Sequence, residues 1–347
     1  MIMSVLSISL NTETLVQILT LGFAAFIAAM AVTPIYTTLA YKYEWWKRPR
    51  TTTLTGEVAK VFSKLHAAKH KRLIPTMAGA ILVVAVAFVT VIGNLTRQQT
   101  WLPLAALIGG GLVGLIDDII NIRSDGTGIA GLRSKIKLLL MVVVASIGGW
   151  WFWAKLDVTS IHLPVVGTWE LGWLIVPLFA FVVVATANAV NMTDGLDGLA
   201  GGLTTTAFGV YAIIAFLEKQ YFLSGFCMSM VGALLSYTWF NIYPARFFMG
   251  DVGSFAIGTA LGVVAMMTDT VALLPIIGLV FVCEAGSVIL QITSKKLRNG
   301  KKIFRVSPIH HHFEAIGWPE TKVTMRFWII GQVAGVIGLI VFLMGGY

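Results

Sequence analysis

Acidic and amide side chains that are able to bind a cation stand at the ends of apolar stretches of this 347-residue chain. The positions are Asp117, Asp118, Asn191, Asp194, Asp197 and Asp251. Carboxylates in such places are costly to bury and are functional candidates by default. Oxygen ligands of this kind suit Mg²⁺, which takes one or two protein carboxylates together with substrate phosphates and water. Nearby basic residues would stabilise phosphoryl oxygens, so the set favours phosphoryl transfer.

The spacing of these residues predicts how they are presented. Adjacent helical residues point about 100° apart, so we expect either Asp117 or Asp118 to reach the site while its neighbour orients a partner. A second group is spaced by three residues and consists of Asn191, Asp194 and Asp197. These side chains would share one face if their segment were helical.

A structural interpretation competes with the functional one. Asp194-Gly195 and Asp197-Gly198 are common turn dipeptides, and Asp251 is able to cap a helix that follows it. We favour a shared site because all six positions fall on the same predicted side of a membrane.

Three consecutive histidines, His310, His311 and His312, form a second concentration of polar side chains. Beside Mg²⁺, imidazoles serve as hydrogen-bond donors to phosphate or as proton carriers. A zinc site is not favoured, because Cys227 and Cys283 lie singly inside apolar runs. We therefore expect the histidines to contact a pyrophosphate.

The elements that must position these groups are membrane-spanning helices. Hydrophobic residues make up 57% of the chain and charged residues 12%, about half the usual charged share of a soluble protein. Ten apolar runs approach the length needed to span a bilayer, about 17 to 25 residues. They cover residues 15–40, 75–95, 101–122, 138–154, 173–190, 199–217, 222–240, 252–268, 271–293 and 327–345. We predict an all-α polytopic membrane protein with about ten transmembrane helices and one domain, residues 1–347.

The distribution of positive charge predicts the orientation. Of the 25 lysine and arginine residues, 22 follow odd-numbered spans, and only Arg97, Lys155 and Lys219 fall on the other side. Basic residues concentrate in cytoplasmic loops, so both termini are expected to be extracytoplasmic and the acidic groups cytoplasmic. Many of these charges are explained by topology and contacts with anionic lipid. No nucleic-acid partner is expected.

Four motifs resemble one family closely. They are Asn188 to Gly202 (NAVNMTDGLDGLAGG), Gly114 to Asp118 (GLIDD), Phe248 to Ser254 (FMGDVGS) and Ser307 to Glu314 (SPIHHHFE). In the order in which they occur along the chain, they resemble the motifs of the phospho-N-acetylmuramoyl-pentapeptide transferases, or MraY translocases, of the polyprenyl-phosphate N-acetylhexosamine-1-phosphate transferase superfamily. The resemblance runs from about Pro75 to the C-terminus.

The resemblance implies a fold and a reaction. Members of the family have ten transmembrane helices and a cleft on the cytoplasmic side. They are usually homodimers and lie in the bacterial cytoplasmic membrane. Its reaction moves phospho-MurNAc-pentapeptide from UDP-MurNAc-pentapeptide to undecaprenyl phosphate. The products are lipid I and UMP, Mg²⁺ is required, and the pathway is peptidoglycan synthesis.

The resemblance also implies roles for individual residues. Asp251 would hold the metal, Asp117 would either deprotonate the lipid phosphate or attack the pyrophosphate, and Asp118 would support the site. His310 would act in catalysis, and His311 and His312 would contact the phosphates or the sugar.

The implied substrate-binding residues surround the nucleotide. They are Lys71, Lys137, Asn191, Asp194, Asp197, Asn241 and Phe248, the last stacking on uracil. Lys69 and Arg72, which lie close to Lys71 in the sequence, are alternative candidates for its role. Phe248 has a plain alternative as an aromatic residue at the membrane interface.

Three questions stay open in the sequence. A related transferase using UDP-GlcNAc would carry the same acidic motifs, although the triple histidine favours the muropeptide donor. A cation transporter would also carry intramembrane acids, but its sites lie near the membrane midplane. Glu284, inside a span, either stabilises a helix break or lines a groove for lipid.

Overall fold

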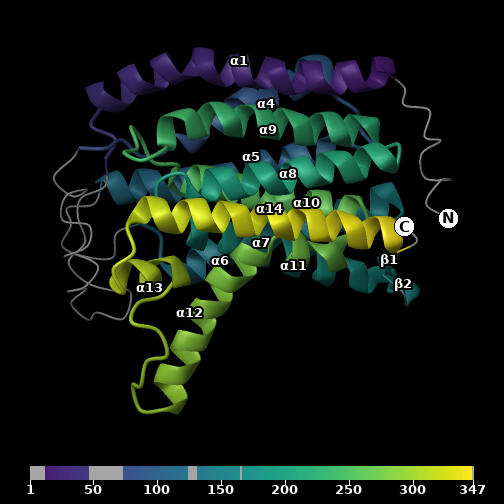
Figure 1. Ribbon diagram of the computed structural model, residues 1–347. Coiled ribbons are helices and arrows are strands. Elements are labelled where there is room, and N and C mark those ends of the chain that lie inside the picture. The colour runs from purple at the N-terminus through teal and green to yellow at the C-terminus, as the bar shows by residue number, and fades with distance from the viewer. Residues whose placement is uncertain (1–11, 47–72, 124–130, 165, 346–347) are drawn as a thin grey trace.

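The chain folds into a bundle of long, roughly parallel helices (Figure 1). A computed structural model describes residues 12–46, 73–123, 131–164 and 166–345. The long helices are α1 (Thr12–Lys42), α4 (Gly79–Gly93), α5 (Trp101–Arg123), α6 (Ser134–Leu156), α7 (Ile175–Thr193), α8 (Leu199–Leu217), α9 (Tyr221–Asn241), α10 (Gly250–Met267), α12 (Leu279–Leu297) and α14 (Glu320–Met344). Shorter elements are β1 (Ser160–Leu163), β2 (Gly167–Glu170), η2 (Gly172–Leu174), η3 (Val271–Leu273), α11 (Leu274–Ile277) and α13 (Ile309–Ala315).

The prediction of a helical polytopic membrane protein is confirmed. Within the described residues, eight helices are long and apolar enough to cross a membrane, and a bent pair makes a ninth candidate. Each of the ten apolar runs coincides with a helix or with that pair. Helix α4 has 15 residues and is shorter than the eight helices that are long enough to cross a membrane. The exact number of crossings stays a prediction.

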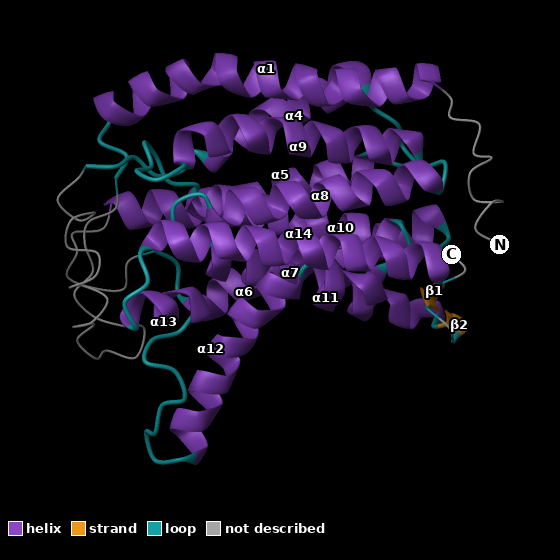
Figure 2. Cartoon of the chain, viewed as in Figure 1, coloured by secondary structure: helices purple, strands orange, loops and turns teal. Residues whose placement is uncertain are grey.

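Two features depart from a simple series of straight spans. A short antiparallel hairpin, β1 and β2, joins α6 to η2 and pairs Ser160 with Glu170 (Figure 2). The predicted ninth span is broken, because α12 turns by 83° from the preceding segment Val271–Ile277. Gly278 lies at this break, and α12 points away from the other helices (Figure 1).

The centre of the bundle is α10, in which every residue from Val252 to Met266 is buried. Its glycines allow neighbouring backbones to approach closely, as is common between membrane helices. A methyl group on Gly79 of α4 would lie 2.1 Å from the Cα atom of Gly253. One on Gly114 of α5 would lie 2.1 Å from the carbonyl oxygen of Asp251. The start of α10 is therefore pressed against the last turns of α5.

The two ends of the bundle differ (Figure 1). One end carries α13, the C-terminal end of α5 and the start of α10; we call it the site end. The opposite end carries the hairpin, the start of α1 and the end of α14 (Figure 1). The acidic positions singled out in the sequence therefore gather at one end.

The contact at Gly114 generates a testable expectation. Gly114→Ala places a methyl group against the α10 backbone, which is not free to move without separating α5 from α10. We expect the free energy of unfolding to fall by about 1–3 kcal/mol, as for other overpacked sites, measured by thermal or denaturant unfolding in detergent.

The matched control is Gly209→Ala in α8, where nothing lies within 4 Å of an added methyl group. This variant is expected to be neutral or slightly stabilising, because alanine favours a helix over glycine. Equal losses in the two variants would contradict the close contact.

Candidate active site

Three aspartates meet where α5 and α10 touch. Asp117 and Asp118 stand near the C-terminal end of α5, and Asp251 lies in the first turn of α10. One carboxylate oxygen from each lies within 4.8 Å of the other two. Asp117 and Asp118 are buried and Asp251 is partly exposed. The structure thus joins positions 134 residues apart into one acidic cluster.

The two adjacent aspartates have different partners, as their spacing predicts. Asp118 Oδ2 accepts a hydrogen bond of 3.0 Å from the backbone N–H of Val252, in the first turn of α10. A carboxylate there also interacts favourably with the helix dipole. Gly250, at φ 75°, begins the helix in a backbone conformation that favours glycine. A methyl group on it would lie 2.5 Å from Asp118 Oδ2. Asp118 therefore fixes the start of the helix that carries Asp251.

Lys137, near the start of α6, links the other two aspartates. Its Nζ lies 3.0 Å from Asp117 Oδ2 and 2.6 Å from Asp251 Oδ2. Asp117 Oδ1 accepts a hydrogen bond of 2.7 Å from the backbone N–H of Leu132. The ammonium also lies 5.4 Å from the centre of the Phe255 ring, a distance suited to a cation–π contact.

The donor set fits a hard cation. All three side chains offer carboxylate oxygens, which Mg²⁺ and Ca²⁺ prefer, and Asp251 is open enough to reach an ion that also holds water or substrate. Close like charges repel unless a cation stands among them. In this structure the ammonium of Lys137 provides a positive charge between Asp117 and Asp251. This acidic cluster is therefore able to bind a metal ion.

Asn191 extends the cluster toward α7. Its amide donates to Ser254 Oγ at 2.8 Å and to Asp251 Oδ1 at 3.3 Å. Ser254 in turn donates to the Gly250 carbonyl at 3.1 Å. Ser254 closes one of the sequence motifs, but no role was predicted for it, although its position three residues after Asp251 puts the two on one helix face.

The condition under which the three residues would share one helical face is not met. Helix α7 ends at Thr193, and the chain turns through Asp194 to Gly198 before α8 begins. Only Asn191 lies on the helix, because the glycines at 195 and 198 favour a turn over continued helix. The competing interpretation as turn dipeptides is thus correct for the backbone.

This turn is held from several directions. Asp197 Oδ2 accepts from the Ala245 N–H at 3.0 Å, and its own N–H donates to Glu320 Oε1 at 2.7 Å. The N–H of Gly198 donates to Asn241 Oδ1 at 2.9 Å, while Asn241 Nδ2 donates to the Phe247 carbonyl at 2.9 Å. Asp197 and Asn241 are buried. They have a structural role in fixing the turn, and their contact with a nucleotide stays a prediction.

The two phenylalanines after α9 differ in environment. Phe247 is buried and packs against Tyr36, Tyr237 and Phe240. Phe248 is partly exposed, and its backbone exchanges hydrogen bonds with Pro75 and Ala78. Of these two, Phe248 is the more exposed, and its stacking on uracil stays a prediction.

The histidines stand on α13, which is anchored between α12 and α14. Gln291 of α12 accepts from the N–H groups of Ile303 and Phe304 at 3.0 and 3.1 Å. Phe313 packs edge-to-face on Phe327 of α14, with ring centres 5.8 Å apart. The loop before α13 is therefore tied to the bent helix, and the triple histidine is held at the site end.

The three histidines have different environments. His310 is completely buried beside Glu284, whose carboxylate lies 2.8 Å from His310 Nδ1. His311 Nδ1 lies 2.7 Å from Glu314, and burial lowers the pKa of His311 although Glu314 opposes the shift. His312, partly exposed, accepts from the Arg305 N–H at 3.1 Å. The two roles considered for Glu284 from the sequence, at a helix break or in a lipid groove, did not include this contact with His310.

Lys71, with its neighbours Lys69 and Arg72, lies outside the described residues. Its contact with substrate stays a prediction. Asp194, by contrast, is described and caps the C-terminal end of α7, partly exposed beside Asn191.

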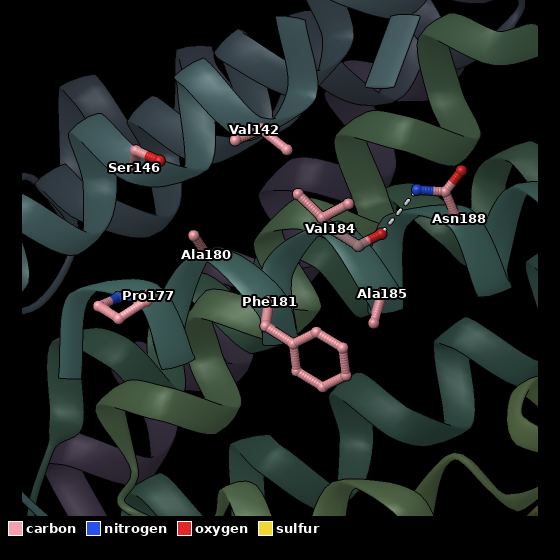
Figure 3. Close-up of a pocket in the computed structure, with 8 residues that line it drawn as sticks. All are labelled: Val142, Ser146, Pro177, Ala180, Phe181, Val184, Ala185 and Asn188. Carbon is pink, nitrogen blue, oxygen red and sulfur yellow. Dashed lines mark hydrogen bonds between the residues drawn. The ribbon is translucent and has the colours of Figure 1, made fainter. Parts of the chain in front are cut away.

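An apolar pocket of about 430 Å³ lies between α6 and α7 (Figure 3). Its lining consists of Val142, Ser146, Pro177, Ala180, Phe181, Val184, Ala185 and Asn188. Asn188 lies one turn before Asn191 and donates to the Val184 carbonyl at 2.8 Å, as the dashed line shows (Figure 3). The pocket thus ends close to the α7 residue that contacts Asp251.

Comparisons with known proteins identify the family. Residues 100–269 match the model of glycosyl transferase family 4. A phospho-N-acetylmuramoyl-pentapeptide-transferase of Chloroflexus aurantiacus is 34% identical over 96% of this chain and 92% of its own length. One from Clostridium novyi is 38% identical over 91% of this chain and 94% of its own. One from Geobacillus thermodenitrificans is 39% identical over 76% and 82%, respectively. The chain belongs to the phospho-N-acetylmuramoyl-pentapeptide-transferase family.

Proposed function

We propose that this protein transfers phospho-MurNAc-pentapeptide from UDP-MurNAc-pentapeptide to undecaprenyl phosphate, giving lipid I and UMP. The observation that carries the proposal is the acidic cluster with Lys137 at one end of a membrane bundle. A polar phosphate site beside apolar helices suits a reaction between a nucleotide in water and a phosphate on a lipid. The relatives carry the same activity in their names.

Mg²⁺ is the metal that we assign to this cluster. Asp251 would hold it, because its carboxylate is the most open of the three, with Asp117 beside it. When bound, the ion supplies positive charge to the pyrophosphate oxygens, as in other phosphoryl transfers.

The residues of the chain then divide the work. Asp117 either takes the proton from the lipid phosphate or attacks the pyrophosphate itself. Either route makes a P–O bond to the lipid phosphate and breaks the one to UMP. Lys137 neutralises phosphate oxygens once it leaves the aspartates, and Asp118 keeps α10 in place. The turn at Asp194, with Asn241 and Phe248, would receive the nucleotide.

The pocket between α6 and α7 gives the lipid a place to lie. It is lined by apolar side chains and ends near Asn191, which contacts Asp251. A prenyl chain in this pocket would bring its phosphate toward the acidic cluster.

The cellular setting follows from the distribution of charge. Basic residues concentrate in cytoplasmic loops, and the predicted excess lies on the side of the acidic groups, so the site end would face the cytoplasm of a bacterial cytoplasmic membrane. A single domain over residues 1–347 and a homodimer are part of the same proposal.

The choice of donor is tested directly. Purified protein given UDP-MurNAc-pentapeptide, undecaprenyl phosphate and Mg²⁺ should release UMP, because the uridylyl half is the leaving group. Release is followed by chromatography of the nucleotide products. Turnover with UDP-GlcNAc and none with the muropeptide donor would favour the related transferase instead.

Lys137 should compete with a metal for the same two carboxylates. We expect substrate-free Lys137→Gln protein to bind Mn²⁺ at least about tenfold more tightly than wild type, because a positive charge next to the ion is removed. The measurement is a titration followed by electron paramagnetic resonance. The same variant should turn over more slowly, since a phosphate-neutralising charge is lost.

Asp251→Asn is the opposite test, because it removes the carboxylate that we assign to the metal. It keeps the shape of the side chain, so thermal unfolding should be nearly unchanged, while Mn²⁺ binding weakens and turnover falls about 100-fold or more. Weaker Mn²⁺ binding by Lys137→Gln, or near-normal turnover by Asp251→Asn, would contradict the assigned roles.

Filling the apolar pocket should affect the lipid substrate alone. In Ala185→Trp a bulky ring enters the pocket, and we expect the KM for undecaprenyl phosphate to rise about tenfold with the donor KM unchanged. Ile213→Trp, on an exposed face of α8, is the control. Equal KM values for wild type and Ala185→Trp would exclude the pocket as the lipid site.

A further inference from the structure

Glu284 is a completely buried acid on α12, and its partner comes from another element. Its Oε2 lies 2.8 Å from Nδ1 of His310, and both side chains are 0% exposed. An acid inside an apolar helix is costly unless it is paired. The 83° bend before α12 leaves room at its base for α13, which packs against both α12 and α14. The fold therefore brings together two groups 26 residues apart.

We infer that Glu284 is a positioning residue for the transfer reaction, acting through His310. It holds the imidazole with Nδ1–H toward α12 and with Nε2 toward the turn that begins at Asp194. The inference rests on the proposed function, because it assigns the task of this pair to that site.

The position of the ring supports the direction of this assignment. A methyl group built on Gly195 would lie 2.2 Å from His310 Nε2 and 2.8 Å from its Cε1. The far edge of the imidazole therefore lies directly against the backbone of the turn. The ring of His311 packs on His310 at 63°, with centres 4.1 Å apart. Glu284, Gly195 and His311 thus fix the ring on three sides.

The chemistry of the pair then sets the role of Nε2. An ionised carboxylate only accepts hydrogen bonds, and with Glu284 in this form the proton of the 2.8 Å contact lies on Nδ1. The hydrogen bond made by one ring nitrogen of a histidine decides the state of the other. Nε2 is directed at the backbone of Gly195, so through His310 the carboxylate of Glu284 positions the turn that begins at Asp194. This turn would receive the nucleotide donor, and the pair acts on the transfer reaction through it.

A purely structural role for Glu284 at the helix break has less support. The break lies six residues earlier, at Gly278. There the N–H of Gly278 donates to the Leu274 carbonyl at 2.8 Å, and the N–H of Val282 donates to the Gly278 carbonyl at 3.1 Å. Both backbone groups of Gly278 are therefore paired with backbone, and the Glu284 side chain contacts His310 instead.

A double-mutant cycle tests the coupling, using Glu284→Gln, His310→Asn and the combined variant. Glu284→Gln should lower kcat/KM for the nucleotide donor by about 10- to 100-fold, as loss of a supporting carboxylate does elsewhere, with the KM for undecaprenyl phosphate unchanged. The combined variant should be no slower than His310→Asn alone, because residues acting as a unit are not additive. Multiplying losses would overturn the inference.

Ser287→Ala is the matched control for disturbance of the helix. Ser287 is buried one turn further along α12, and its hydroxyl bonds only locally, to the Glu284 carbonyl at 2.7 Å. This variant should keep kcat/KM for the donor close to that of wild type. A loss equal to that of Glu284→Gln would assign the effect to helix packing.

A readout without turnover separates this inference from the proposed function. Nitrogen NMR of histidine-labelled protein, with the His310 signal assigned by its loss in His310→Asn, should show the proton on Nδ1 in wild type. Glu284→Gln should shift it toward Nε2. The same state in both proteins would overturn the inference. Absence of UMP release by wild type would instead count against the proposed function, and the NMR comparison would still decide the pairing.

Discussion

The contact between α5 and α10 is the constraint on which the acidic cluster depends. Gly114 lies so close to the Asp251 carbonyl that no side chain fits between them. This contact brings the last turns of α5 to the first turn of α10, and Asp118 fixes that turn through the Val252 N–H. Like-charged carboxylates repel, so the helix packing supplies the free energy that holds them together. Lys137 reduces the repulsion from a third helix.

The remaining elements bring further polar groups to the same end. Asn191 of α7 reaches Asp251, and the turn after it is fixed by Asn241 and Glu320. The bend at Gly278 turns α12 outward, so that α13 fits at its base and His310 lies against Gly195. The site is thus assembled from segments between Gly114 and Glu320, each held by a specific contact.

Much of this arrangement was predictable from the sequence, because apolar length and the ends of apolar runs are local signals. The helices and the position of the acids at their ends follow from these signals. The turn after Thr193 was predicted only as one of two alternatives, because a spacing of three is also compatible with a helix. The hairpin at Ser160 is too short to produce a pattern. Glu284 was recognised as unusual, but its pairing with His310 depends on a bend that composition does not encode.

The central claim is that this site breaks the pyrophosphate of the donor and passes a phosphosugar to the lipid. Donor labelled with ³²P at the phosphorus next to the sugar tests the claim most directly, in one incubation with undecaprenyl phosphate and Mg²⁺. The account predicts that the label appears in the lipid fraction and that the released UMP is unlabelled. Label recovered in water-soluble UDP, with unlabelled sugar on the lipid, would show transfer of the sugar alone and would contradict the account.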